Sequence, residues 1–290
     1  MTSSQFEYFA PDSIQEAIEL LIEKGNHAHV MAGGTDLLLK IRRRILKPKA
    51  IISLNKIKGL KKISFNRKNG LLIGATALLA DVASDKDILS HFPAIAYAAK
   101  NTANVQIRNM GTIAGNLCNA SPSADNAPVL LAMNAQINVT GPDKETTIPL
   151  TSFFKGPGLT ALRPAMIVTS VFVPIAPPNS GSSYTYLSAR GKVDCSAVGV
   201  GAMVTLNGTQ CTNAGIAMGA CAPIPMRAYK AEELITGQNL SESLIQEVAD
   251  QTVKEVMPIT DVRASADYRR KIVAVLTKRA LLQAWKSAVE

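Results

Sequence analysis

The sequence predicts an α+β protein with two or three domains, and three observations lead to this prediction. The first fifty residues alternate apolar and amphipathic segments in the order of a β-α-β unit. Residues 58–173 mix strand-like runs with helical ones, and residues 184–219 are rich in strand-like runs before three helical segments follow. A chain of 290 residues has room for this organisation, at about 100–200 residues per domain.

The first helix is predicted over residues 11–25, because its apolar side chains recur on one face. Ser13 and Glu16 have the spacing of a capping box, in which each side chain accepts from the backbone N–H at the other position. Asp12 could cap the helix instead. Gly25 is the residue type that commonly ends a helix.

The rest of the first unit is predicted as a strand, a turn, a helix and a strand. Residues 28–32 are a short apolar run, and the chain then turns at Gly33–Gly34. Thr35 or Asp36 is predicted to cap the second helix, and residues 50–54 form the closing strand.

The middle of the chain is predicted to mix both types of element, with Pro93 breaking a helical region. The expected elements are strands in 58–80 with a turn at Asn69–Gly70, helices over 78–102, a helix over 127–133, and strands over 135–140 and 166–173. Three prolines, three serines and a glycine between residues 174 and 183 indicate a domain boundary.

The last third is predicted as a small β-sheet followed by helices. The expected strands are 184–189, 196–206 and 211–219, with a hairpin at Asn207–Gly208, and the expected helices are 228–236, 241–256 and 264–287. In the final helix an apolar stripe is interpreted as core, namely Tyr268, Ile272, Val275, Leu276 and Trp285.

Composition excludes several functional classes. The net charge is +9, but the basic stretches contain no interspersed aromatic residues and no nucleic-acid-binding motif. The positive charge is therefore better explained by a solvated surface or by an acidic partner than by binding to nucleic acid. The four cysteines form no C-x-x-C pair, which argues against a metal or iron–sulfur site within the chain and favours the cytoplasm. The sequence has no apolar run of bilayer-spanning length and no secretory leader.

Two polar, glycine-rich segments are the strongest functional signal, and we name them the first loop (residues 32–36) and the second loop (residues 111–128). The first loop, Ala-Gly-Gly-Thr-Asp, lies between a predicted strand and a predicted helix, where backbone N–H groups can approach a phosphate closely. A plain strand–helix turn is the alternative interpretation.

The second loop carries glycines, hydroxyls and amides, and it contains no lysine or arginine. Thr112, Asn116 and Ser123 can donate to phosphate oxygens, and Gly111 and Gly115 allow close backbone approach. Two such loops about eighty residues apart suggest that both hold one elongated ligand, for which a dinucleotide is the natural candidate.

Asp125 can accept from ribose hydroxyls, as acidic residues do in other dinucleotide sites, although it could instead cap the helix that follows. Gly199-Val-Gly201 lacks the third glycine of a Rossmann fingerprint and lies in an apolar strand, so it is interpreted as structural. The chain has no P-loop, no nucleophile elbow and only three histidines. Any catalysis is therefore expected to come from a cofactor, and no catalytic residue or metal ligand is predicted.

At these residues the chain resembles the FAD-binding medium subunits of the molybdenum hydroxylases. The first loop resembles the family's A-G-G-x-[DS] turn, residues 112–116 its T-[IV]-[GA]-G-N turn, and residues 121–125 its S-P-x-x-D run. Residues 153–158 and 258–265 look like further landmarks of the family, and the resemblance covers essentially the whole chain.

The resemblance implies an FAD-binding fold of two α+β subdomains, similar to the PCMH/VAO type, followed by a C-terminal α/β domain with a small antiparallel sheet. The expected domains are residues 1–56, 57–175 and 176–290. The residues implied to bind FAD are Val30, Met31, Ala32, Gly33, Gly34, Thr35, Asp36, Leu37, Thr102, Gly111, Thr112, Gly115, Asn116, Ser123, Asp125, Ile167, Val168, Tyr184 and Tyr186.

One stretch departs from the family. Members often carry an aromatic residue and a lysine ahead of an arginine-rich turn near the flavin, whereas residues 184–190 contain no lysine and have Ser188 about where it would stand. Tyr184 or Tyr186 could stack on the flavin ring, or both could pack within the sheet. No inserted cysteine-rich loop is present, which disfavours the 4-hydroxybenzoyl-CoA reductase branch.

The function implied is electron transfer in a cytoplasmic oxidoreductase complex. A large molybdopterin-binding subunit would oxidise the substrate, a small [2Fe–2S] subunit would pass electrons to FAD, and the heterotrimer is expected to dimerise. The acceptor could be NAD⁺, oxygen, a quinone or another molecule. Two alternatives remain open at this point, namely a stand-alone FAD-dependent oxidase or reductase of the same fold and a nucleotide-binding regulatory module.

Overall fold

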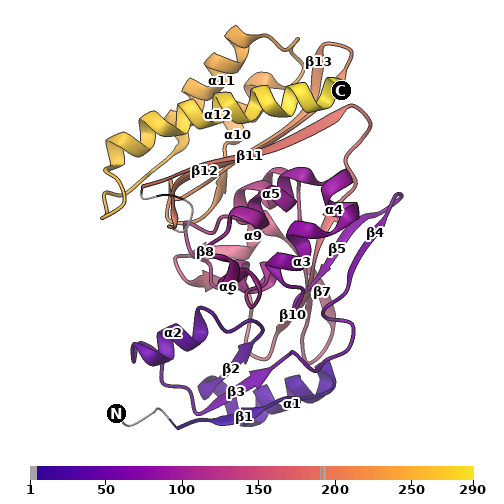
Figure 1. Cartoon of the computed structure of the whole chain (residues 1–290), viewed down its shortest axis with the longest axis vertical. Helices are drawn as coiled ribbons and strands as arrows, with labels where there is room; N and C mark the ends of the chain where they lie inside the picture. Colours follow the sequence, from indigo (N-terminus) through magenta and orange to yellow (C-terminus); the bar gives the residue numbers. More distant parts are fainter. Residues whose placement is uncertain (1–4, 190, 192–193) are drawn as a thin grey trace.

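The computed structural model describes residues 5–189, 191 and 194–290. Three units are stacked along the long axis of the molecule, with the N-terminal unit at one end and the C-terminal unit at the other (Figure 1). Each unit has its own hydrophobic core cluster, and the N-terminal cluster also includes Ile167 from the middle unit.

The N-terminal unit is a three-stranded parallel sheet with the strand order β1-β3-β2. Its elements are β1 (Glu7–Phe9), α1 (Ile14–Lys24), a 3₁₀ turn (Gly25–His27), β2 (Ala28–Met31), α2 (Leu37–Arg42) and β3 (Ala50–Ser53). The predicted β-α-β unit is confirmed. Ser13 Oγ accepts from the N–H of Glu16 at 3.1 Å, Glu16 Oε2 accepts from the N–H of Asp12, and Gly25 ends α1 at φ 60°.

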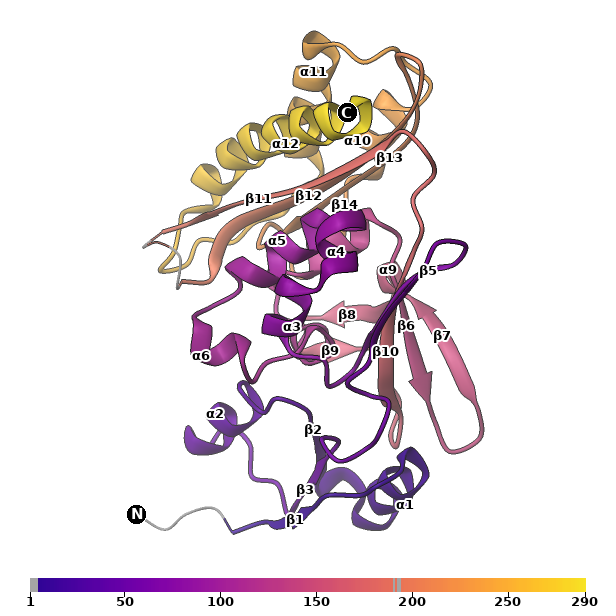
Figure 2. The same cartoon turned by 45° about the vertical axis from the view of Figure 1, so that its right-hand side comes forward.

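The middle unit contains a five-stranded antiparallel sheet, in the order β4-β5-β10-β6-β7, with helices on one face (Figure 2). Its strands are β4 (Ile63–Asn66), β5 (Gly70–Gly74), β6 (Gln136–Thr140), β7 (Glu145–Pro149), β8 (Phe154–Gly156), β9 (Leu159–Thr160) and β10 (Ile167–Pro174). Its helices are α3 (Leu79–Ser84), α4 (Lys86–His91), α5 (Pro93–Asn101), α6 (Val105–Arg108), α7 (Ile113–Cys118), α8 (Ala127–Ala132) and α9 (Leu150–Phe153).

The C-terminal unit is a four-stranded antiparallel sheet with helices. Its elements are β11 (Ser180–Ser188), β12 (Ser196–Asn207), β13 (Gln210–Gly219), β14 (Met226–Arg227), α10 (Tyr229–Ile235), α11 (Glu242–Glu255) and α12 (Ala266–Val289). Helix α12 runs along β11, where Ser183 Oγ donates to Ala280 O at 2.7 Å. On the other face, Gly215 lies so close to α8 that a Cβ there would be 2.1 Å from Ala132 O. The sheet therefore packs tightly onto the middle unit.

Three predictions about local structure were wrong. Neither Thr35 nor Asp36 caps α2 with its side chain, and the second loop is not irregular throughout, because residues 113–118 form α7. The apolar stripe of α12 is not all core, since Tyr268 is 48% exposed and Val275 is 43% exposed. Leu276 of the predicted stripe is buried, and the packed face also carries Arg269, Thr277 and Ala280.

Two further points concern the whole chain. In the part of the chain that the structure describes, no helix combines the length and the apolarity needed to cross a membrane. We retain the division at residues 56/57 and 175/176 as a proposal, which is consistent with the end of β10 at Pro174 and the start of β11 at Ser180.

Candidate functional site

The two loops that the sequence singles out touch each other through their backbones. A Cβ added at Gly33 would lie 2.0 Å from Met110 O and 2.9 Å from Gly111 Cα. Lys40, one turn into α2, donates from Nζ to Asn119 Oδ1 at 2.7 Å, and this bond joins segments 79 positions apart. The tertiary fold thus brings the loops together, as a shared ligand requires.

The first loop offers unused backbone donors. Among the described residues, the N–H groups of Gly33, Gly34, Thr35 and Asp36 donate to no acceptor. These residues precede α2 and remain at least partly accessible to solvent. Partial desolvation by the surrounding chain raises the pKa of Asp36, and the charge of Lys40 opposes the shift. The loop is therefore suited to bind an anionic group through its backbone.

The second loop is organised around the start of α7. Thr112 Oγ1 accepts from the N–H of Gly115 at 2.9 Å, which makes Thr112 the N-cap residue. Among the described residues, the N–H group of Ala114 has no acceptor, and Thr112 forms an antiparallel bridge with Leu78. A Cβ at Gly115 would lie 3.0 Å from Thr112 Oγ1, so glycine lets the capping hydroxyl approach the backbone of residue 115 closely.

Asn126, which the sequence analysis did not single out, connects two of the predicted residues. Its Nδ2 donates to Thr102 Oγ1 at 3.1 Å and to Asn116 Oδ1 at 3.2 Å. Thr102 in turn donates to Ala98 O at 2.9 Å. Asn126 is 1% exposed, and its Oδ1 has no partner among the described residues. This network holds the Asn116 side chain by its oxygen. The Nδ2 group of Asn116 therefore remains available as a donor.

Asp125 is held by the C-terminal unit. Its Oδ1 accepts from Ser196 Oγ and, at 3.3 Å, from Tyr184 OH. Burial raises the pKa of Asp125 above its ordinary value, and the two hydroxyl donors only partly offset the shift. Asp125 is not the side-chain cap of α8, because that helix has no side-chain cap bond.

The two tyrosines lie side by side on β11, with ring centroids 5.9 Å apart and nearly parallel planes. Tyr184 is buried in the core of the middle unit, and burial raises the pKa of its hydroxyl well above the ordinary value. Tyr186 is half-buried and donates to Asn101 Oδ1 at 3.1 Å. Ser188 donates to Gly191 O, while Arg190, the end of the stretch noted in the sequence, lies outside the described residues.

The end of the β11–β12 hairpin lies near both loops. Partial desolvation raises the pKa of the Cys195 thiol, the charge of Arg263 opposes the shift, and Asp125 and Asp36 add to it. These charges come from the C-terminal unit, the second loop and the first loop. All three units therefore contribute to the surroundings of one site.

The remaining predicted residues lie on strands beside the loops. Val30 and Met31 are on β2, directly before the first loop, and Leu37 is the first residue of α2. Ile167 and Val168 begin β10, where Ile167 belongs to the core of the N-terminal unit and Val168 to that of the middle unit. They lie at the seam between these two units.

The donor set fits a dinucleotide such as FAD. Backbone N–H groups without an acceptor among the described residues, from two touching loops, suit a diphosphate, and the close approach at Gly33 admits no side chain between the loops. Asp125 supplies a carboxylate, the acceptor type that binds ribose hydroxyls in other dinucleotide sites, and Asn126 Oδ1 is a buried acceptor without a partner among the described residues.

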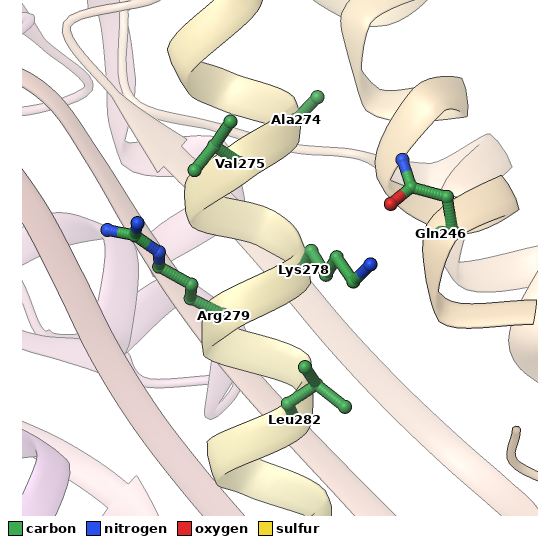
Figure 3. Close-up of a pocket in the computed structure, with 6 residues that line it drawn as sticks. All are labelled: Gln246, Ala274, Val275, Lys278, Arg279 and Leu282. Atoms are coloured by element: carbon green, nitrogen blue, oxygen red, sulfur yellow. The ribbon is translucent and has the colours of Figure 1, made fainter. Parts of the chain in front are cut away.

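A separate groove lies on the outer side of the C-terminal unit, between α11 and α12 (Figure 3). Its volume is about 290 Å³, and it is lined by Gln246, Ala274, Val275, Lys278, Arg279 and Leu282. None of these residues belongs to either loop, so the groove is not part of the candidate site. Among the described residues, no group of three or more potential metal-ligating side chains is present.

Replacing Asp125 by asparagine is expected to stabilise the FAD-free protein at neutral pH while weakening FAD binding. The folded protein raises the pKa of Asp125, so its ionised form disfavours folding above the pKa of the unfolded chain, about pH 4. The stabilisation should therefore vanish at lower pH. Thermal unfolding at both pH values and FAD titration measure the two effects.

Asp143→Asn is the matched control for Asp125, because Asp143 is an exposed aspartate outside both loops. It should leave both the pH dependence of unfolding and FAD affinity unchanged. If Asp125→Asn destabilised the FAD-free protein at neutral pH and still bound FAD with unchanged affinity, the assigned role of Asp125 would be wrong.

Comparison with known families gives two matches that together span nearly the whole chain. Residues 4–176 match the family model described as the FAD binding domain in molybdopterin dehydrogenase. Residues 182–284 match the model described as the CO dehydrogenase flavoprotein C-terminal domain.

Two characterised relatives are similar over their full length. The chain is 31% identical to the glyceraldehyde dehydrogenase medium chain of Sulfolobus acidocaldarius, over 97% of this chain and 98% of that one. It is also 31% identical to the carbon monoxide dehydrogenase medium chain of Hydrogenophaga pseudoflava, over 98% of this chain and 99% of that one.

Solved structures show the same fold. The structure of the carbon monoxide dehydrogenase of Hydrogenophaga pseudoflava that lacks the Mo-pyranopterin moiety of its cofactor matches with a TM-score of 0.95. That match is 31% identical and covers 99% of both chains. Quinoline 2-oxidoreductase of Pseudomonas putida 86 matches with a TM-score of 0.92, at 26% identity, over the full length of both chains.

Proposed function

Since the chain belongs to the family of FAD-binding medium subunits of the molybdenum hydroxylases, we propose that it carries electrons from the [2Fe–2S] clusters of a partner subunit, through FAD, to an external acceptor. As a member of that family it is the flavoprotein component of an oxidoreductase. The observation that carries the proposal is the contact between the two loops, both of which hold backbone N–H groups without an acceptor among the described residues.

The role proposed for each residue follows from the hydrogen-bonding groups that it offers. The first loop and the start of α7 bind the diphosphate through backbone N–H groups, and Asn116 and Ser123 add side-chain donors. Asp125 accepts from a ribose hydroxyl. Ile167 and Val168 supply apolar contact at the seam between two units. The full proposed set comprises the nineteen residues named in the sequence analysis, including Tyr184 and Tyr186 on β11.

When bound, FAD supplies the ability to take up electrons one at a time and release them in pairs. This chain's contribution is to hold the cofactor, exclude water from part of it and set its surroundings. Tyr184 is engaged by Asp125 and buried, so of the two tyrosines Tyr186, which is half-buried, is the better candidate to approach the flavin ring.

The surface beside the loops supports a partner in direct contact. Exposed apolar side chains adjoin the site residues in sequence on three segments, namely Leu38 and Leu39 on α2, Val105 and Met110 around α6, and Ile259 and Val262 before α12. Figure 2 shows α2, α6 and the start of α12 on the same side of the molecule. Exposed apolar groups clustered around a site are typical of protein contact surfaces.

The names of the relatives support the identity of the partners. They are medium chains, and the matched carbon monoxide dehydrogenase is described with a molybdenum cofactor. We therefore propose a heterotrimer with a large molybdopterin-binding subunit and a small [2Fe–2S] subunit, and that this heterotrimer dimerises. All four cysteines are free, which supports a cytoplasmic location.

The decisive experiment is to purify the tagged full-length chain from its own cells under mild conditions. We expect two other subunits to co-purify, together with molybdenum, iron and FAD, and we expect the flavin to be reduced after the iron–sulfur centres when substrate is mixed rapidly with the complex. The stand-alone oxidase alternative makes the opposite prediction. A chain that purifies alone, without molybdenum or iron, and turns over a small substrate by itself would refute the proposal.

A further inference from the structure

The segment between α11 and α12, residues 256–265, contacts the second loop from the C-terminal unit. Arg263 donates from Nη1 to Ser123 Oγ at 3.1 Å, joining positions that are 140 residues apart. Ser123 Oγ also lies 3.1 Å from Ser121 Oγ. Because Arg263 occupies one lone pair of the Ser123 oxygen, the hydroxyl proton must point away from the guanidinium group.

Asp261 holds the guanidinium group of Arg263 in this position. Its Oδ2 lies 3.0 Å from Arg263 Nη2, and its Oδ1 accepts from the backbone N–H of Arg263 at 2.8 Å. The carboxylate therefore binds Arg263 at both the backbone and the side chain. Such an arrangement restricts the side chain far more than a single surface ion pair would.

Asp261 is itself anchored by a buried cation. Its Oδ1 accepts from Arg269 Nη2 at 2.6 Å, and Arg269 is 2% exposed. Arg269 Nη1 donates to the backbone carbonyls of Ala197 and Ala220, each at 2.8 Å. The N–H of Ala220 donates to Pro122 O, within the second loop, at 2.6 Å. The same anchor thus reaches the second loop by two routes, through Ser123 and through Pro122.

The same two arginines keep Asp261 ionised. Although partial burial acts to raise it, the backbone N–H of Arg263 and the charges of Arg263 and Arg269 hold the pKa of Asp261 below its ordinary value. Asp261 therefore stays ionised at neutral pH, and its hold on Arg263 is lost only as the pH falls through that lowered pKa.

We propose that Asp261 and Arg263 are positioning residues of the FAD site, which hold Ser123 and the residues around it in the conformation that receives the cofactor. The inference rests on the proposed cofactor role of Ser123. The C-terminal unit is thereby a structural part of the site, although neither positioning residue belongs to the two loops. With its proton directed away from Arg263, Ser123 acts as a donor, and the adjacent positive charge strengthens that donor toward an anionic ligand.

The test compares Arg263→Gln with the wild-type full-length chain, using FAD titration and thermal unfolding without FAD. We expect the dissociation constant for FAD to rise on the order of tenfold, the effect of a charge-assisted hydrogen bond. The melting temperature of the FAD-free protein should change little, because Arg263 is partly exposed and Asp261 keeps its bond to Arg269.

Arg270→Gln is the matched control. Arg270 lies on α12 next to Arg269 and makes an exposed ion pair with Asp267 at 2.9 Å. This variant loses the same charge close by in the sequence, and the ion pair of Arg270 is with Asp267 rather than with the second loop. We expect unchanged FAD affinity. An equal loss of affinity in both variants would mean that general charge, rather than positioning, is responsible, and would overturn the proposal.

A double-mutant cycle separates positioning from simple structural support. If Arg263 acts through Ser123, then Arg263→Gln should weaken FAD binding in the wild-type background and have little further effect in the Ser123→Ala background. Full additivity of the two losses would overturn the proposal, and so would an Arg263→Gln protein with wild-type FAD affinity. The proposed role of Ser123 fails separately if Ser123→Ala binds FAD as well as the wild type does.

Discussion

Replacing Gly33 by alanine is expected to abolish the retention of FAD during purification. The added Cβ would lie 2.0 Å from Met110 O and 2.7 Å from the adjoining carbonyl carbon. Both atoms belong to the backbone, so no side-chain rotation relieves the clash, and the two loops must separate by on the order of 1 Å. A displacement of that size in a preorganised site is expected to cost on the order of a hundredfold in affinity.

The measurement is the visible flavin absorbance of the purified protein, followed by titration with FAD. The three core clusters do not include Gly33, so the FAD-free protein should still fold. Gly156→Ala is the control, because a Cβ there meets only the side chain of Leu159, whose nearest atom, Cδ1, lies at an ordinary 3.5 Å. A yellow Gly33→Ala protein with wild-type affinity would show that contact between the loops is not required.

Replacing Arg269 by methionine is expected to cause the largest loss of stability. The substitution removes the donors to two buried backbone carbonyls and leaves Asp261 without its buried counter-ion. Removing one partner of a buried ion pair costs about 3–5 kcal/mol in the free energy of unfolding. For a protein of this size, the melting temperature should fall by on the order of 10 °C.

Thermal unfolding of the FAD-free protein measures this effect. Arg270→Met serves as the control, since Arg270 is partly exposed and its partner Asp267 is almost fully exposed. The control should lie close to the wild type, because exposed ion pairs contribute little to stability. If Arg269→Met melted at the same temperature as the control, the view of Arg269 as the anchor of the segment before α12 would be wrong.

Local patterns predicted most of the elements correctly. The β-α-β unit, the breaks at Gly25 and Pro93, and the hairpin at Asn207–Gly208 all depend on residues within a few positions of each other. Ser13 is predicted correctly as a helix cap because its bond to the N–H of Glu16 spans only three residues. Such features follow from backbone preferences and short-range hydrogen bonds, which a sequence displays directly.

In helix α12, the spacing of apolar residues predicted the buried face only in part. Its apolar residues are not confined to one face, so the stripe chosen from spacing alone included the exposed Tyr268 and Val275. The buried face also carries Arg269, whose Nη1 and Nη2 groups donate to other segments while its Nε has no partner among the described residues, and Thr277, whose hydroxyl bonds that of Thr252. A buried arginine has no signature in a hydrophobic pattern, because the carbonyls and the carboxylate that make its burial tolerable come from β12, from Ala220 directly after β13, and from the segment before α12.

The sequence by itself determined the cofactor class and the residue types of the two loops, because close backbone approach and short polar side chains depend on which amino acids stand there. Only the tertiary structure decided that Gly33 meets Gly111, that Lys40 bonds Asn119, and that Ser196 and Arg263 reach the second loop. These contacts join positions far apart in the chain. Their formation depends on how three cores pack together, and no local spacing encodes that packing.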